Sequence, residues 1–275
     1  MKPNNGILGE RKSPVMRKIK VVAIATGVKG GGGSVSDNKK TGPMAQVALL
    51  VWGMSALEAL KQGLDRAICG DCRHRGKQVK DPVTKAIKNV GRTCDVLLYK
   101  SIETITKKMQ GIPCRKGVEG KAYGEGALAP GQPVRLGSYG DCGLVPIKWL
   151  EAWTKVATKW TGYTHQWLTM NLDAKKHGRF LMASCDTIEE AEEADRRGWR
   201  FFLTVPIGTP LPKTVNGKRV LPCPWSPGAM KSGQEPPTCH DCCLCSGTDG
   251  KGSLSIAITA HGQNADNFKW EGGEV

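Results

Sequence analysis

Short apolar runs recur along this chain, separated by polar and glycine-rich stretches. Residues 20–26 and 45–51 are nearly continuous apolar runs with the length of a buried strand. Residues 55–67 and 146–160 instead carry apolar residues at helical spacing. The pattern therefore predicts that strands and helices alternate. Further strands are expected at 93–99, 134–136, 163–167, 180–184, 200–205, 220–223 and 254–260, and further helices at 101–110 and from Thr187 to Arg197.

Repeated strand-then-helix units predict an α/β fold. Several of the later strands lack a clear following helix, so an irregular or incomplete (β/α) barrel with a cysteine-rich C-terminal loop fits better than a regular eight-fold barrel. Residues 1–42 are expected to form a flexible basic N-terminal arm, and residues 43–275 a single barrel-like α/β domain that includes a metal-binding loop at 223–247. In such folds the polar residues just past the strand ends line the active face.

The chain is strongly basic. Forty Lys and Arg residues against 25 Asp and Glu give a net charge of +15, and residues 1–40 hold nine basic and two acidic residues. This excess favours an anionic partner, most commonly nucleic acid; a solvated basic surface without a partner is the alternative. No apolar run has membrane-spanning length and no secretory signal is visible. A cytoplasmic protein that does not engage membranes is expected.

Seven of the eleven cysteines fall into two groups. In the reducing cytoplasm such thiols are expected to be ligands rather than disulfide partners, and soft thiolates suit zinc or an iron–sulfur cluster. The C-terminal cysteine group consists of Cys223, Cys239, Cys242 and Cys245, the last three at C-x-x-C-x-x-C spacing. The upstream cysteine group consists of Cys69, Cys72 and Cys94.

The two groups differ in the number of thiolates that they offer. Four thiolates suit a closed structural zinc or a closed cluster. Three thiolates leave one metal position free for substrate, unless His74 or Cys114 fills it. Cys142 and Cys185 are interpreted as small buried thiols.

Polar residues also follow four predicted strands. These are Asp141, His165, Asp186 and His261, and they converge at one mouth if their strands are parallel neighbours. Asp186 is interpreted as a helix cap, because a cap is needed at that place. For His165 and His261 a catalytic role and a buried structural role both stay open. Asp141 lies in a glycine-rich turn, where the backbone can approach a ligand closely, and we expect it to be functional.

Several of these motifs together resemble a phage-encoded family of gene-product-88-like proteins, which is similar to reduced relatives of the radical S-adenosylmethionine barrel. The resemblance covers about residues 43–262 and rests on CGDC…RTC, PVRLGSYGD, TGYTHQW, MASCDTIEEA and IAITAHG. It implies a barrel of βα units that holds an iron–sulfur cluster through Cys69, Cys72 and Cys94. It also implies that Gly137, Ser138, Gly140 and Asp141 contact the methionine end of S-adenosylmethionine.

The cysteine spacing departs from that superfamily. Its members usually carry three cysteines in one C-x-x-x-C-x-x-C loop, whereas Cys94 follows Cys72 by more than twenty residues. Cluster binding without radical chemistry therefore stays open.

Three functions follow from these patterns. The first is a phage-type metalloprotein in the host cytoplasm that binds iron–sulfur clusters and acts on or beside nucleic acid, with S-adenosylmethionine as a further cofactor. The second is a zinc-stapled nucleic-acid-binding protein without catalysis. The third is a hydrolase or transferase that uses Asp141, His165 and His261 with one open metal. The oligomeric state is not indicated.

Overall fold

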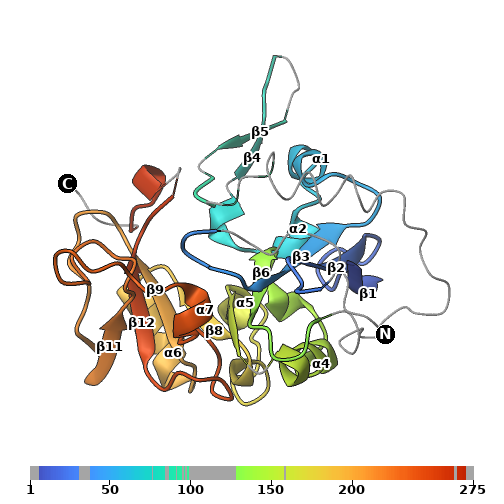
Figure 1. Ribbon diagram of the computed structural model, residues 1–275. Coiled ribbons are helices and arrows are strands. Elements are labelled where there is room, and N and C mark those ends of the chain that lie inside the picture. Colours follow the sequence, from blue (N-terminus) through green and yellow to red (C-terminus); the bar gives the residue numbers. More distant parts are fainter. Residues whose placement is uncertain are drawn as a thin grey trace.

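The computed structural model describes residues 6–30, 38–75, 77–83, 87–90, 92–94, 96, 98, 128–157, 159–262 and 265–270. Within these residues ten strands form one mixed sheet, in the order β1-β2-β3-β6-β7-β8-β9-β12-β11-β10 (Figure 1). Strands β4 and β5 form a separate antiparallel hairpin. The strands are β1 Gly6–Lys12, β2 Lys20–Thr26, β3 Ala45–Val51, β4 Lys77–Lys80, β5 Ile87–Val90, β6 Val134–Tyr139, β7 Trp160–Thr164, β8 Met182–Cys185, β9 Phe201–Val205, β10 Thr214–Val215, β11 Lys218–Pro222 and β12 Ser255–Thr259.

The centre of the sheet is parallel. Strands β3, β6, β7, β8 and β9 follow one another in the sheet in chain order, with the β4–β5 hairpin between β3 and β6 along the chain, and β12 and β11 continue the sheet in parallel. Strands β1, β2 and β10 pair antiparallel at the two edges. The edge strands β1 and β10 do not pair with each other, so the described sheet is open. The prediction of an α/β fold is confirmed at this level.

Helices and short turns connect the strands. Helix α6 begins after Thr187, whose hydroxyl accepts a hydrogen bond from the Glu190 backbone N–H, and a glycine with positive φ, Gly198, follows its end. None of the described helices is long and apolar enough to cross a membrane. The helices are α1 Ala56–Lys61, α2 Arg66–Cys69, η1 Arg73–Arg75, η3 Cys142–Leu144, α4 Ile147–Ala157, α5 Gln166–Thr169, η4 His177–Arg179, α6 Ile188–Arg196, α7 Cys239–Cys242 and η5 Ala265–Asn267.

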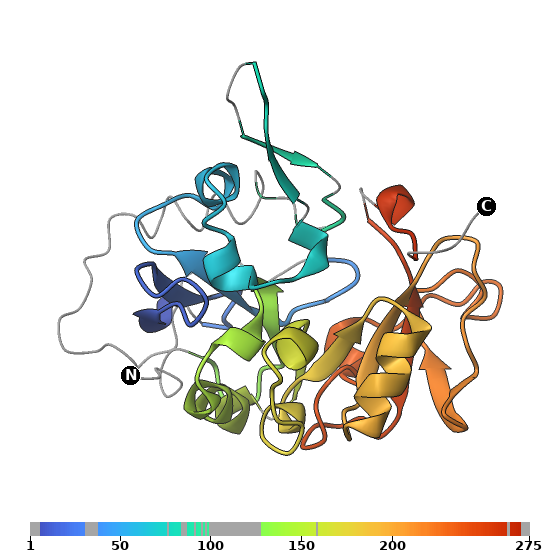
Figure 2. The same ribbon diagram turned by 180° about the vertical axis from the view of Figure 1, so that it is seen from behind.

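The two faces of the parallel sheet have different coverings. Because side chains alternate along a strand, Ala183 and Cys185 pack in the core cluster that also holds the α6 residue Ala191. Met182 points to the other face and packs in a cluster with Cys223 and Cys245. Figures 1 and 2 place α6 and α7 on opposite faces of the sheet. The cysteine-rich segment therefore covers the face that α6 leaves open.

The N-terminal region corrects the prediction of a flexible arm at 1–42. Residues 6–26 instead supply β1 and β2, which extend the main sheet. Leu8 and Ile24 are fully or almost fully buried. Strand β1 also lies directly on α4, since a Cβ on Gly9 would lie 2.6 Å from the Trp149 ring. The apolar stretch of β1 is short, and the basic residues that follow it concealed the strand in the sequence.

Other element boundaries in the structure also differ from the predicted ones. Strands β2 and β3 have the predicted limits, but the predicted helix at 55–67 divides into α1 and α2 around Gly63, which has a φ of +71°. Trp160 belongs to β7 and not to the preceding helix. The hairpin of β4 and β5 was not predicted, and the described residues of 93–99 do not form a strand. The predicted helix at 101–110 and Cys114 lie outside the described residues.

Candidate metal centres

The carboxyl ends of three neighbouring strands bring three predicted site residues together. Asp141, His165 and Asp186 directly follow β6, β7 and β8 or lie within two residues of their ends. The Asp141 Oδ2 atom accepts a 2.7 Å hydrogen bond from the His165 backbone N–H, and His165 Nε2 lies 3.6 Å from Asp186 Oδ2. Parallel order at this edge of the sheet is the reason for the convergence, because it places successive strand ends side by side.

His261 belongs to a different place. Its side chain is exposed, and its Nε2 atom contacts the Nζ atom of Lys40. The Lys40 carbonyl in turn accepts a 2.8 Å hydrogen bond from the Cys239 backbone N–H. His261 is thus connected through Lys40 to the segment that carries the C-terminal cysteine group.

Asp141 holds the loops of the site in place. The carboxylate is almost fully buried and accepts hydrogen bonds from the Gly143 N–H at 2.8 Å, the His165 N–H at 2.7 Å and the Gln166 Nε2 atom at 3.3 Å. Its own backbone N–H donates to the Ile68 carbonyl. Both oxygens are therefore used within the chain, which fits a positioning role better than the predicted catalytic one.

The glycine-rich turn before Asp141 also has structural reasons for its composition. Gly140 has a φ of +79°, and a Cβ there would lie 2.7 Å from the Cβ of Leu49. A Cβ on Gly137 would lie 2.9 Å from the Gly140 carbonyl oxygen, and the Ser138 hydroxyl donates to the Val47 carbonyl. The turn is shaped by close packing against β3. The predicted contact of these residues with S-adenosylmethionine stays a prediction.

Asp186 is not the helix cap that the sequence suggested. Thr187 caps α6, and the Asp186 carboxylate points to His74, whose Nε2 atom lies 3.0 Å from Oδ1. The Nδ1 atom of His74 lies 2.6 Å from the hydroxyl oxygen of Thr93. Arg73 Nε lies 3.5 Å from Asp186 Oδ2. A buried carboxylate in contact with two histidines and an arginine is a charged centre, not a local cap.

Burial and charge oppose each other in this cluster. Burial by itself would raise the pKa of Asp186, but the hydrogen bond with His74 and the charges of His165 and Arg73 outweigh it and hold that pKa below its usual range. Burial lowers the pKa of His165 despite the attraction of Asp186. His165 is thus favoured in its neutral form, which is the form of imidazole that acts as a base or a ligand.

The upstream cysteine group lies beside this charged cluster. Burial raises the pKa of the Cys69 thiol, and the charge of ionised Cys94 raises it further. For Cys72 the same burial acts together with the charges of Cys69, Asp141 and Asp186. Each of these thiols is therefore close enough to oppose ionisation of the next. Cys69 therefore lies within electrostatic reach of both Cys72 and Cys94.

The turn that carries Cys69 and Cys72 is fixed at both ends. Arg75 binds Asp65 through two hydrogen bonds, of 2.8 and 2.7 Å, and so joins the residues that flank the turn. Gln166 donates to the Cys69 carbonyl at 3.0 Å. A Cβ on Gly70 would lie 2.2 Å from the Oε1 atom of Gln166, so only glycine fits there. Nothing in the local sequence signals the role of Gln166.

The four thiols of the C-terminal cysteine group lie near one another. Burial raises the pKa of Cys245, and the charges of the other three members raise it further. Burial raises the pKa of Cys223 and Cys239 as well, with further contributions from the charges of neighbouring members of the group. Cys243 also lies near the group, because burial and the charges of Cys242 and Cys239 raise its pKa to about 11, and its thiol donates to the carbonyls of Cys239 and His240.

Two residues that sequence reasoning missed support this group. The Tyr163 hydroxyl forms a hydrogen bond with the Cys245 thiol. The buried Arg200 guanidinium donates to the carbonyls of Leu244 at 2.9 Å, Ser246 at 2.5 Å and Leu254 at 2.5 Å. Arg200 thereby fixes the segment on both sides of Cys245. An arginine directly before a strand gave no sign of this role.

The thiols of the two cysteine groups suit metals that bind thiolates. The spacing of the thiols bears on which metal they can hold. Zinc with bonds of about 2.3 Å to sulfur would place tetrahedral thiolates about 3.8 Å apart. Among the described residues, the one trio of His, Cys, Asp or Glu ligand atoms that all lie within 4.8 Å of one another is His74, His165 and Asp186. Among the described residues, neither cysteine group therefore holds three ligand atoms at the spacing of a tetrahedral zinc site.

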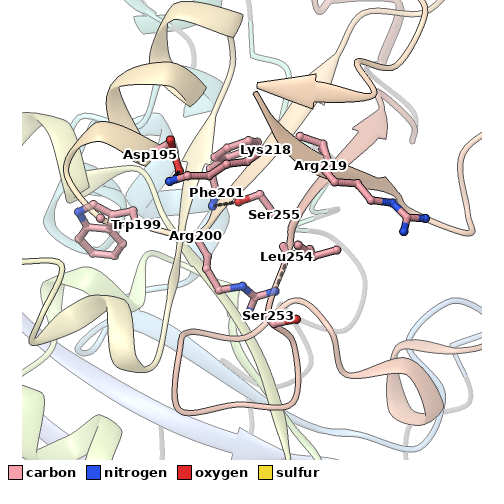
Figure 3. A pocket seen from close by; sticks show the side chains of 11 residues that line it. Asp195, Trp199, Arg200, Phe201, Lys218, Arg219, Ser253, Leu254 and Ser255 are labelled. Carbon is pink, nitrogen blue, oxygen red and sulfur yellow. Dashed lines mark hydrogen bonds and ion pairs between the residues drawn. The ribbon is translucent and has the colours of Figure 1, made fainter. Parts of the chain in front are cut away.

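A cavity of about 220 Å³ lies at the opposite edge of the sheet, at the amino ends of β9, β11 and β12 (Figure 3). Arg200, Lys218 and Ser255 are among the residues that line it. Lys218 binds Asp195 at 2.7 Å, and the Ser255 hydroxyl accepts from the Phe201 N–H at 3.0 Å. Figure 3 shows Arg200 reaching to the backbone at Leu254. Arg200, Lys218 and Ser255 thus bind other parts of the chain. None of the predicted site residues lines the cavity.

No protein-family model, curated protein or solved structure matches this chain. The arrangement of its own residues therefore carries the functional argument.

Proposed function

We propose that this protein is a metalloprotein with two cysteine-bound centres, at least one of them an iron–sulfur cluster, that acts on or beside nucleic acid. The observation that carries the proposal is the gathering of the four thiols of the C-terminal cysteine group, which come from the residue after β11, from α7 and from the segment after α7. In a reduced protein, four gathered thiols are typical of a shared metal centre rather than of disulfides. The thiols do not all lie within 4.8 Å of one another, which favours a cluster over one tetrahedral zinc ion.

The upstream cysteine group is the centre that we assign to chemistry. Three thiolates leave a coordination position, and His165 and Asp186 lie next to them. When bound, a cluster there would supply electron transfer or a Lewis-acidic iron. S-adenosylmethionine is one ligand that we propose for the open position, in line with the resemblance to the gene-product-88-like phage family. The parallel strands β3, β6, β7, β8 and β9, which follow one another in the sheet, support an incomplete (β/α) barrel as the finer description of the fold.

Metal analysis of the anaerobically purified protein tests the two centres. We expect iron and inorganic sulfide in the wild type, with broad visible absorption. Cys242→Ala and Cys72→Ala should each lose part of the iron, because each removes one ligand of a different centre. The control Cys185→Ala, which alters a buried thiol on the α6 side of the sheet, should keep the wild-type iron content. A wild-type protein without iron contradicts the iron–sulfur proposal.

Zinc is the second candidate, and four converging thiolates are the observation that favours it. In that case the protein would bind nucleic acid without catalysis. Stoichiometric zinc without iron or sulfide would select this function over the first. The same samples therefore distinguish the two proposals.

Binding to nucleic acid follows from the net charge of +15. We expect the affinity for a fluorescent single-stranded or duplex oligonucleotide to fall steeply as salt rises, because lysine and arginine contacts to phosphate release counterions. The slope of log affinity against log salt measures those contacts. An affinity that does not change with salt, or no binding at low salt, would contradict the nucleic-acid part of the proposal.

A further inference from the structure

We propose that His74, His165 and Asp186 bind one divalent first-row metal ion, at a site separate from both cysteine groups. One ligand atom from each of the three residues lies within 4.8 Å of the other two. The residues come from η1, from the residue before α5 and from the turn before α6. Three elements far apart in the chain thus place two imidazoles and one carboxylate around a common point.

Two of the candidate ligand atoms lack a hydrogen-bond partner. Asp186 Oδ2 and His165 Nε2 are both buried, and neither has a hydrogen-bond partner, although Arg73 Nε forms an ion pair with Oδ2 at 3.5 Å. Asp186 as a whole is 1% exposed. A buried carboxylate oxygen without a partner costs about 1–3 kcal/mol or more, and such groups are rare in native proteins unless an ion or water completes them. A bound cation would satisfy both atoms at once.

The distances suit such an ion. Metal bonds to imidazole nitrogen and carboxylate oxygen are about 2.0–2.2 Å long, so two ligand atoms of one ion lie about 3–3.5 Å apart. His165 Nε2 and Asp186 Oδ2 are separated by 3.6 Å, and His74 Nε2 and Asp186 Oδ1 by 3.0 Å. Because all three ligand atoms lie within 4.8 Å of one another, shifts of at most about 2 Å bring them onto one ion.

The surroundings orient the ligands as in known metal sites. The Nδ1 atom of His74 lies 2.6 Å from the Thr93 hydroxyl oxygen, which directs Nε2 toward Asp186. The Phe268 ring lies 5.5 Å from the His74 ring and covers that side of the cluster. Arg73 also approaches Asp186, but Glu190 binds it at 2.5 Å and offsets its charge. Two imidazoles with one carboxylate suit Fe²⁺, Mn²⁺ or Zn²⁺ and leave positions open for water or substrate.

Titration with Mn²⁺ tests the site, because this ion prefers nitrogen and oxygen ligands to the thiolates of the cysteine groups. The loss of the free Mn²⁺ electron paramagnetic resonance signal reports binding. We expect the full-length wild type to bind one Mn²⁺. His165→Ala and Asp186→Asn should bind at least about ten-fold more weakly, and Thr93→Val should show a smaller loss through misorientation of His74. The control His177→Ala, a histidine outside the cluster, should bind as the wild type.

A second readout separates loss of the site from loss of the fold. Mn²⁺ should raise the thermal unfolding midpoint of the wild type and of His177→Ala, but not that of His165→Ala, because only a native site is stabilised by its ligand. The iron or zinc content of the cysteine groups should be the same in all these proteins. Equal Mn²⁺ binding by wild type and His165→Ala, or no binding of Mn²⁺ or Co²⁺ by the wild type, would overturn the proposal without affecting the cysteine centres.

Discussion

The two cysteine groups lie in opposite kinds of surroundings. The upstream cysteine group begins at the end of α2, and the buried carboxylates Asp141 and Asp186 border Cys72. In the C-terminal cysteine group, Cys223 and Cys245 lie on a face of the sheet among apolar residues such as Met182 and Ile256, while Cys239 and Cys242 are partly exposed. The first group therefore neighbours ionisable side chains, and half of the second group is packed among apolar ones.

This difference teaches how the two groups are used. A group of four thiols packed partly among apolar side chains and held by a buried arginine is typical of a structural centre. A centre next to His165 and Asp186 has charged and ionisable side chains within reach, which is typical of a reactive one. We interpret the C-terminal cysteine group as a structural centre that stabilises the fold, and the upstream cysteine group as the site of chemistry.

The largest effect is expected from Arg200→Met. The guanidinium satisfies the carbonyls of Leu244, Ser246 and Leu254, and methionine would leave them without a partner. The free energy of unfolding should fall by at least about 3 kcal/mol. The C-terminal cysteine group should lose its metal while the upstream group keeps it. Urea unfolding and metal analysis measure the two effects.

Arg219→Met is the matched control for that variant. Arg219 lines the same cavity but is exposed, so its loss should change the free energy of unfolding by less than about 0.5 kcal/mol. If Arg200→Met kept both its stability and the metal of the C-terminal cysteine group, the interpretation of that group as a structural centre would be wrong.

A smaller effect is expected from Gly70→Ala on the other group. Gly70 has a φ of +57°, and its added Cβ would displace the Gln166 amide that binds the Cys69 carbonyl. The variant should lose about 2 kcal/mol of stability and retain less metal in the upstream cysteine group. The same two measurements apply, and the C-terminal group should be unaffected.

Gly53→Ala is the control that separates the effect of backbone strain from the effect of displacing a neighbouring side chain. Gly53 also has a positive φ, of +73°, but a Cβ there has open space around it. Its cost should be about 1 kcal/mol from the backbone alone, without loss of metal. Equal metal loss in both glycine variants would show that the contact with Gln166 is not what positions Cys69.

Much of the sheet was predictable because its signals are local. The apolar runs gave β2 and β3 with their observed limits, and Thr187 with Glu190 gave the start of α6. Strand β1 and the hairpin of β4 and β5 were missed, since short strands with basic residues resemble loops. The convergence of Asp141 and His165 was predictable once the strands were taken as parallel neighbours.

The sequence by itself determined the α/β class, the two sets of cysteines and the residues at the strand ends, because apolar period and motif spacing act over a few neighbouring residues. Only the tertiary structure decided that His74 contacts Asp186, 112 positions away, and that Arg200 binds the segment around Cys245. It also placed His261 beside Lys40 and showed that Asp141 accepts a hydrogen bond from the Gly143 backbone N–H. Such contacts depend on which elements pack together across the sheet, and no local pattern encodes that choice.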